Sequence, residues 1–112
     1  LALNVTRHRM LQGQGKVDES RVNQAVRAHG NNIEYVPAAL IAVVLLALLG
    51  YEIVWINLLG GMLFLARVMH GYGMQVSTPG LPKTRFLGNI ITWLIYIVLS
   101  TVLIVEYFLR VQ

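Results

Sequence analysis

The sequence predicts an all-α integral membrane protein built as a four-transmembrane-helix bundle. Of its 112 residues, 56% are hydrophobic and only 12% are charged, whereas a soluble domain has about 25% charged residues. The apolar runs are too long for strands and do not alternate. Because no repeat or low-complexity tract divides the chain, we expect a single transmembrane domain over residues 1–112.

The first half of the chain predicts two helices. Leu1–Met10 is apolar at its start, and we expect it to be the end of a first helix that begins upstream of this sequence. Two glycines in Gln12–Lys16 predict a loop. The second helix begins with the amphipathic stretch Glu19–Tyr35 and continues as the apolar Ala38–Leu49.

The third predicted helix follows a short polar break at residues 50–52 and covers Ile53–Val68. Its Gly60 and Gly61 would allow a neighbouring helix to approach closely. A short break between two apolar segments makes them antiparallel neighbours.

The last predicted helix covers Phe86–Val105, a run without any charged residue. Its length is close to the roughly 20 residues that cross a bilayer as a helix. Turn-forming residues in Gln75–Lys83 separate it from the third helix.

The basic residues predict the orientation of this bundle. Successive helices place alternate loops on opposite sides of the membrane, and of the basic residues only Arg110 falls on one side. The positive-inside rule therefore places the other side in the cytoplasm. The residues on that side are Arg7, Arg9, Lys16, Arg21, Arg27, Arg67, Lys83 and Arg85.

Several functions are excluded by composition. The chain has no cysteine, which excludes disulfides, thiolate zinc sites and a cysteine nucleophile. His8, His29 and His70 have no carboxylates at metal-ligand spacing, so no metal site is predicted. The net charge of +4 includes no dense basic run with interleaved aromatic residues, so nucleic acid is not an expected partner.

The strongest polar motif lies at the start of the second helix. Arg27, Asn31 and Glu34 have i, i+4, i+7 spacing and share one helix face. Because ionisable groups are costly next to lipid, we expect these side chains to point into the bundle. The alternative is that Arg27 and Glu34 simply pair with each other.

Two further helices bring polar residues to the same layer. Arg67 and His70 are one turn apart, and Arg85, Asn89 and Trp93 have i, i+4, i+8 spacing. For His70, a structural hydrogen bond or a ligand contact is a better interpretation than proton transfer. The alternative for Arg85 is an interfacial arginine whose charged group reaches water. Three arginines with only Glu34 to balance them favour an anionic ligand.

Other polar residues have simpler interpretations. Tyr35 fits an interfacial aromatic anchor better than a catalytic phenol. Pro37 fits a tolerated kink. Glu106 and Arg110 have i, i+4 spacing and suggest a surface ion pair without a function.

Residues 27–37 resemble the R-x-x-x-N-x-x-E signature, followed by proline, of the membrane-associated proteins in eicosanoid and glutathione metabolism. Residues 7–9, 66–70 and 85–88 support the resemblance, whose spacing fits the bacterial branch. The resemblance implies a four-helix subunit of a homotrimer in the bacterial inner membrane. It also implies glutathione as cosubstrate, bound between subunits near the cytoplasmic face.

The resemblance also implies residue roles. Arg85 matches the arginine that stabilises the glutathione thiolate. Phe86 stands where the prostaglandin branch has serine, and Met74 and Asn89 stand where some eukaryotic members have tyrosines, which disfavours an eicosanoid synthase. The positions implied to bind glutathione are Arg27, Asn31, Glu34, Tyr35, Arg67, His70 and one of Arg7 and Arg9.

Two functions follow as hypotheses. The first is a glutathione transferase or peroxidase that directs the thiolate to a hydrophobic electrophile or a lipid hydroperoxide. The second keeps the fold without catalysis, as a trimeric lipid- or anion-binding protein. A transporter or channel is disfavoured, because no helix has a polar stripe through the centre of the membrane.

Overall fold

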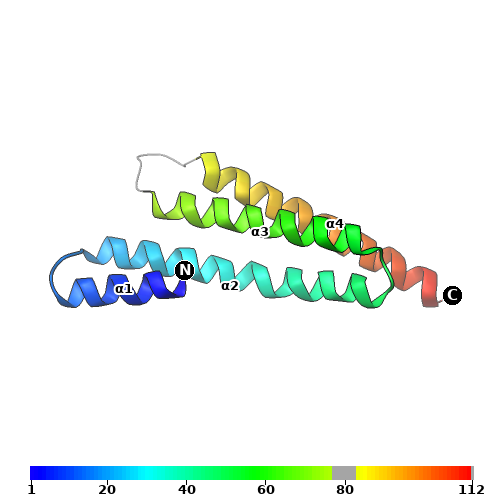
Figure 1. Ribbon diagram of the computed structural model, residues 1–112, viewed down its shortest axis with the longest axis horizontal. Helices are drawn as coiled ribbons and strands as arrows, with labels where there is room; N and C mark the ends of the chain where they lie inside the picture. Colours follow the sequence, from blue (N-terminus) through cyan, green and yellow to red (C-terminus); the bar gives the residue numbers. More distant parts are fainter. Residues whose placement is uncertain (77–82, 112) are drawn as a thin grey trace.

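The computed structural model describes residues 1–76 and 83–111, and within them all regular structure is helical. The helices are α1 (Ala2–Gly13), α2 (Glu19–Leu48), α3 (Ile53–Gln75) and α4 (Lys83–Val111). They form an elongated bundle of 62 × 25 × 22 Å (Figure 1). In this part of the chain α2, α3 and α4 are long and apolar enough to cross a membrane. The prediction of an all-α membrane bundle is confirmed.

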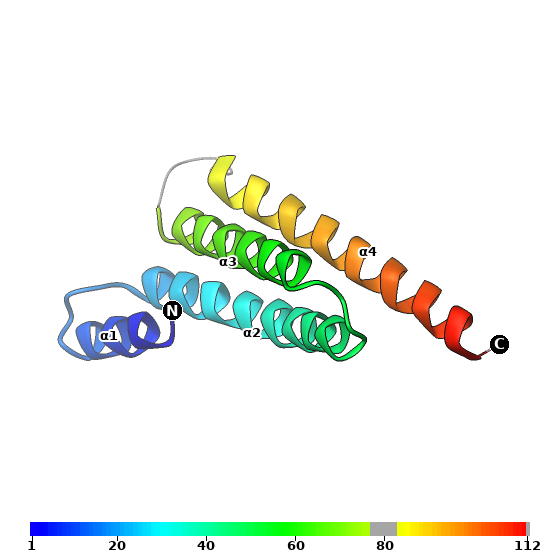
Figure 2. The ribbon, with the colours of Figure 1, turned by 45° about the vertical axis from the view of Figure 1, so that its right-hand side comes forward.

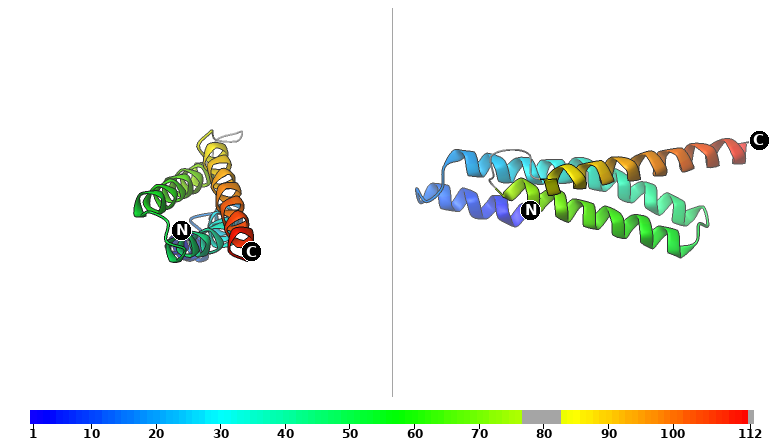
Figure 3. Two further views of the ribbon diagram at one scale, coloured as in Figure 1. Left: turned by 90° about the vertical axis from the view of Figure 1, so that its right-hand side faces the viewer. Right: turned by 90° about the horizontal axis from the view of Figure 1, so that it is seen from above.

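Successive helices are antiparallel, and α1 lies beside the first half of α2 (Figures 1 and 2). The α1–α2 turn, the end of α3 and the start of α4 therefore lie at the same end of the bundle. We call this end the arginine end. The α2–α3 turn and the C-terminus lie at the opposite end, and Leu1 lies partway along α2 (Figure 3).

The helix boundaries follow local signals. Asp18 is the N-cap of α2, where its side chain accepts a hydrogen bond from the Arg21 amide at 3.1 Å. Gly50 has a φ of +88°, a conformation that favours glycine, and it turns the chain between α2 and α3.

Some predicted helix ends differ from the structure. Helix α1 includes Gln12 and Gly13, which were expected in the loop. Helix α2 continues through Pro37, as expected. Helix α3 continues past Val68 to Gln75, because its polar and glycine-rich end is buried against α4. The predicted turn at Gln75–Lys83 falls mostly on residues 77–82, which lie outside the described residues.

An apolar core joins α2, α3 and α4. Large apolar side chains also cover the outside of the helices; Phe64 is 68% exposed and Leu109 is 69% exposed in the single chain. Such a surface is suited to lipid. The buried core consists of Ala39, Val43, Leu46, Leu63, Ile95 and Leu99.

Glycine allows α3 and α4 to approach each other at the arginine end. A Cβ at Gly88 would lie 2.5 Å from the Ala66 carbonyl oxygen and 2.8 Å from the His70 nitrogen. Within the described residues, Gly60 and Gly61 have no such neighbour, so the prediction that they mediate close helix contact is wrong within the chain. The close contact lies nearer the arginine end, because α4 crosses α3 there.

A polar network connects the helices at the opposite end. Tyr51 donates to Glu106 Oε1 at 2.8 Å, and Arg110 Nε donates to Glu106 Oε2 at 2.7 Å. Arg110 Nη2 also donates to the Leu49 carbonyl at 3.1 Å, at the end of α2. The Glu106–Arg110 pair forms as expected, but it also ties the α2–α3 turn to α4. We call these four residues the polar clasp.

We predict that Gly88→Ala destabilises the protein by about 2 kcal/mol, because the added methyl group forces α3 and α4 apart. The measurement is thermal and chemical unfolding in detergent, followed by circular dichroism. Gly61→Ala is the matched control, since a Cβ there meets nothing within 4 Å in the chain, and it should leave stability unchanged or slightly raised. Equal stability of the two variants would contradict the packing argument.

The polar clasp also generates a prediction about Tyr51. Its hydrogen bond to the Glu106 carboxylate raises the pKa of Tyr51 above 10.0, with desolvation adding to the effect. Because the pKa of Tyr51 is higher in the folded than in the unfolded protein, its hydrogen bond stabilises the fold at pH values below the unfolded-state pKa. This stabilisation is lost as the pH rises through the folded-state pKa. The difference in ultraviolet phenolate titration between wild type and Tyr51→Phe should therefore have a midpoint above 10.0. Glu106→Gln should lower that midpoint; an unchanged midpoint would exclude this cause.

Candidate functional site

Arg67 is the centre of the candidate site. It lies on α3 and is only 6% exposed. Its Nε donates to Asn32 Oδ1 at 3.1 Å, and its Nη2 donates to Asn31 Oδ1 at 2.6 Å. Two neighbouring amides on α2 therefore orient a guanidinium that arrives from α3.

The positive charge of Arg67 is not neutralised by a carboxylate in the residues that the structure describes. Arg110 and Glu106 form an ion pair with each other, at the opposite end of the bundle. The buried Nη1 of Arg67 also has no hydrogen-bond partner among those residues. Burying a cation is costly unless it is paired and hydrogen-bonded. The site therefore has both unbalanced positive charge and an unused donor.

His70 lies one turn after Arg67 and is 3% exposed. Its Nδ1 is 3.5 Å from Arg67 Nη2. Because a guanidinium can only donate, Nδ1 must accept, which leaves the imidazole proton on Nε2. This contact agrees with the interpretation of His70 as a structural or ligand-contacting residue.

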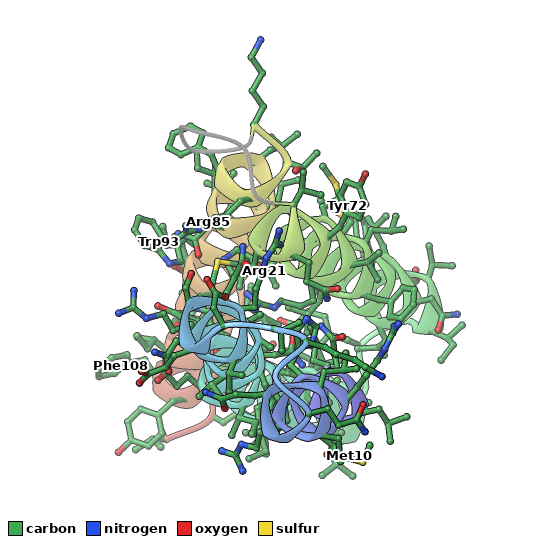
Figure 4. All side chains as sticks on the ribbon, turned by 90° about the vertical axis from the view of Figure 1, so that its left-hand side faces the viewer. Met10, Arg21, Tyr72, Arg85, Trp93 and Phe108 are labelled. Carbon is green, nitrogen blue, oxygen red and sulfur yellow. The ribbon has the colours of Figure 1, made fainter. Side chains whose placement is uncertain are left out.

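Close helix packing positions Arg85 near this pair. A Cβ at Gly73 would lie 2.6 Å from the Arg85 backbone nitrogen, so the first turn of α4 rests directly on α3. Arg85 is partly buried. Figure 4 looks onto the arginine end, with Arg85 on the α4 side. The backbone of Arg85 thus lies against the end of α3, the helix that carries Arg67 and His70.

Tyr35 packs inside the bundle. Its ring meets the Tyr96 ring edge to face, with centroids 6.0 Å apart, and its carbonyl accepts a hydrogen bond from the Tyr96 hydroxyl. The Arg67 guanidinium carbon is 5.7 Å from the Tyr35 ring centroid, within the range of a cation–π interaction. These contacts make Tyr35 a neighbour of the site rather than a separate aromatic anchor.

Arg27 and Glu34 were predicted to point into the bundle, but in the single chain they do not. Both are exposed in the single chain, and they form no ion pair with each other in the described part of the chain. The physical reason is that Val22, Ala25 and Ala28 form the buried side of this part of α2. At 100° per residue, Arg27 and Glu34 fall on the opposite side of the helix.

The two candidate arginines of α1 lie on the helix surface. Arg7 and Arg9 are both exposed. Arg7 lines a polar pocket together with Arg21 and Gln75, at the ends of α2 and α3. The structure brings neither into contact with Arg67 among the interactions it records.

Sequence reasoning missed three polar side chains that take part in the packing of α2, α3 and α4. Asn32 is a direct partner of Arg67, and Tyr96 contacts Tyr35 from α4. Thr92 is fully buried and donates to the Gly88 carbonyl at 2.8 Å. The doubled asparagine at positions 31 and 32 was an available signal, since adjacent amides leading into an apolar span need partners.

An apolar hollow of about 550 Å³ lies between α2 and α3, beside the candidate site. Arg67 and Asn32 supply polar groups on its wall. The apolar part of the wall includes Val36, Leu40, Leu63, Phe64 and Val68. The arrangement places a buried cation next to a space suited to apolar groups.

The helices and this site define an integral membrane protein with a cationic site near one end of its bundle. The model of the MAPEG family matches residues 1–105 of the chain. The chain therefore belongs to the MAPEG family, which confirms the resemblance drawn from residues 27–37.

Two curated relatives match part of the chain. Both are called inner membrane protein YecN, one from Escherichia coli strain K12 and one from strain O6:H1. Each is 32% identical over 68 residues, which cover 61% of this chain and 50% of the relative. The match thus spans about half the length of these relatives. No solved structure matches the chain.

We predict that Asn32→Ala destabilises the protein by about 2 kcal/mol, because it removes a hydrogen bond to a buried charged group. Asn57→Ala is the matched control, as Asn57 is exposed on α3, and it should change stability by less than about 0.5 kcal/mol. Chemical unfolding in detergent gives both values. A variant at Asn32 as stable as the control would show that its amide does not support Arg67.

Proposed function

We propose that this chain is the subunit of a membrane-bound glutathione-dependent transferase or peroxidase. The buried Arg67, with an unused donor and no carboxylate partner in the described residues, is the observation on which the proposal rests. An anionic ligand would supply both the missing acceptor and the missing charge.

The chemistry of the site fits glutathione. Glutathione has two carboxylates, an ammonium group and a thiol, so its site needs several cations, a carboxylate and a group that favours the thiolate. Arg67 would bind a carboxylate through Nη1, while Asn31 and Asn32 hold the guanidinium in place. Family membership supports this ligand.

A homotrimer would complete the site. Arg27 and Glu34 are exposed on α2 of the single chain, where lipid would be a costly neighbour for both charges. A second copy packed against this face would cover them and bring them to glutathione bound between subunits. Glu34 would then accept from the ammonium group, and Arg27 would pair with a carboxylate.

Arg85 would favour the thiolate without accepting a proton. A nearby guanidinium lowers the pKa of a thiol, and the thiolate is the attacking species. The packing of the first turn of α4 on Gly73 would hold Arg85 in place. In the transferase reaction, the thiolate sulfur would form a bond to the electrophilic carbon of the substrate as the leaving group of that carbon departs. In the peroxidase reaction, the thiolate would attack the terminal oxygen of a lipid hydroperoxide, so that the O–O bond breaks and the lipid alcohol leaves after protonation. The glutathione sulfenic acid that forms would then react with a second glutathione to give the disulfide and water.

The proposed hydrophobic substrate is a small molecule or a lipid that reaches the site from the membrane. The apolar hollow beside Arg67 supports this substrate class, because an apolar molecule is concentrated by apolar walls. We place the site at the cytoplasmic face of the bacterial inner membrane. Support comes from the names of the two relatives and from the excess of basic residues at the arginine end.

A second candidate function is a non-catalytic, anion- or lipid-binding trimer. The hydrogen bonds that Arg67 donates to Asn31 and Asn32 favour this second function. The two amide oxygens accept from part of the buried guanidinium without any substrate. Saturable glutathione binding with turnover separates the two candidates.

We predict that Arg85→Ala lowers the rate of glutathione conjugation to a hydrophobic electrophile about 100-fold, because it removes electrostatic stabilisation of the thiolate. Glutathione binding should weaken far less than turnover, and Arg85→Lys should restore part of the rate. The measurement is steady-state kinetics together with the ultraviolet absorbance of bound thiolate. Normal turnover in Arg85→Ala would remove Arg85 from the mechanism.

The binding role of Glu34 is tested with the same preparation. Glu34→Gln should weaken glutathione binding about tenfold or more, because it removes a charge-assisted hydrogen bond. Glu19→Gln is the matched control, being another exposed carboxylate of α2. Equal affinities in calorimetric titration would place Glu34 outside the site.

A further inference from the structure

Tyr96 of α4 has no part in the proposed function, although it reaches the surroundings of Arg67. It is partly buried and packs against the apolar core. Its hydroxyl donates a hydrogen bond to the backbone carbonyl of Tyr35, on α2. A hydroxyl in apolar surroundings requires a partner of this kind. Tyr96 therefore joins α4 to α2 at the level of the candidate site.

The turn of α2 that accepts this hydrogen bond also carries the recorded partners of Arg67 on that helix. Asn31 and Asn32 lie four and three residues before Tyr35, so the three side chains belong to one turn. Arg67 Nη2 donates to the first amide at 2.6 Å, and Arg67 Nε donates to the second at 3.1 Å. The guanidinium carbon is 5.7 Å from the Tyr35 ring centroid. The position of this one turn thus determines how Arg67 is held.

The same turn has one backbone hydrogen bond fewer than a regular helix. Pro37 lies two residues after Tyr35 within α2, and proline has no N–H to donate to the carbonyl four residues before it. A carbonyl oxygen can accept two hydrogen bonds, so the Tyr96 hydroxyl adds a contact without having to displace a helical one. The Tyr96 ring also meets the Tyr35 ring edge to face, with centroids 6.0 Å apart. Both contacts hold the turn against α4.

We propose that Tyr96 is a positioning residue for glutathione binding at Arg67. By holding the turn that carries Asn31, Asn32 and Tyr35, it keeps Nε and Nη2 of the guanidinium engaged and leaves Nη1 for a carboxylate of the ligand. Tyr96 acts through Arg67 and does not touch glutathione. The inference rests on the proposed function, because it assigns this role at the same site.

The contrasting role for Tyr96 is packing alone. Removal of the hydroxyl would then lower the free energy of unfolding, while the affinity of the folded protein for glutathione stayed the same. A positioning role instead predicts a loss of affinity in protein that is fully folded. Arg85, which acts on the thiolate in the proposed mechanism, lies in the first turn of α4, well before Tyr96. Turnover of bound glutathione should therefore be conserved.

The experiment measures glutathione binding and turnover by the purified full chain in detergent. Tyr96→Phe removes the hydroxyl and keeps the ring. Tyr107→Phe is the matched control, because Tyr107 is another tyrosine of α4 and is 61% exposed. Arg67→Lys, alone and combined with Tyr96→Phe, gives a double-mutant cycle; lysine keeps the charge but cannot form the same hydrogen bonds. Circular dichroism and chemical unfolding give the folded fraction of each variant.

We expect Tyr96→Phe to weaken glutathione affinity about fivefold in calorimetric titration, as the loss of one hydrogen bond would. The KM for glutathione should rise by a similar factor, with kcat within about twofold of wild type. Tyr107→Phe should match wild type. In the Arg67→Lys background, Tyr96→Phe should change the affinity by less than about twofold, because the group that it positions is gone.

Two results would overturn the role of Tyr96 and leave the proposed function intact. One is equal glutathione affinity in Tyr96→Phe and Tyr107→Phe. The other is the same loss of affinity from Tyr96→Phe in the wild-type and Arg67→Lys backgrounds, because the hydroxyl would then act independently of Arg67. The first comparison decides by itself if Arg67→Lys does not fold or does not bind. Absence of saturable glutathione binding in wild type would refute the proposed function and this role with it.

Discussion

The burial of the Arg67 guanidinium within an apolar bundle is the constraint on which the site depends. A charge at 6% exposure requires hydrogen-bond acceptors from its surroundings, and Asn31 and Asn32 supply two of them from α2. These bonds fix the position of α2 relative to α3 where the helices are polar. The same burial leaves Arg67 Nη1 without a hydrogen-bond partner in the described residues. One side chain therefore joins α3 to α2 through Nε and Nη2 and leaves Nη1 for a ligand.

The contact between α3 and α4 determines what else can reach Arg67. Because Gly88 has no side chain, the α4 backbone lies against Ala66 and His70 of α3. Ala66 directly precedes Arg67, and His70 follows Arg67 by one helical turn. Gly73 has the same effect at Arg85. Any larger residue at these positions would separate the helices and move Arg85 away from His70. The charged layer therefore depends on two small residues that make no polar contact themselves.

The number and approximate limits of the helices could be predicted, because hydropathy and length determine whether a segment can span a membrane. The end of α3 could not be predicted. Its last residues include Arg67, His70 and two glycines, a composition typical of the membrane–water interface, and their burial depends on the packing of α3 in the bundle. Spacing placed Arg27, Asn31 and Glu34 on one face correctly, but the buried side of α2 depends on α1 and α3. Asn32 was missed for a similar reason: its role depends on which helix lies opposite.

The two ends of the bundle satisfy their polar groups in different ways. In the polar clasp, Glu106 accepts from both Tyr51 and Arg110, while Arg110 also reaches the carbonyl at the end of α2. That end is internally paired and fixes the α2–α3 turn to α4. At the arginine end, cations outnumber carboxylates, and the described residues leave Arg67 Nη1 unused. Since like charges repel unless anions balance them, this end is the one whose stability should respond to bound anions.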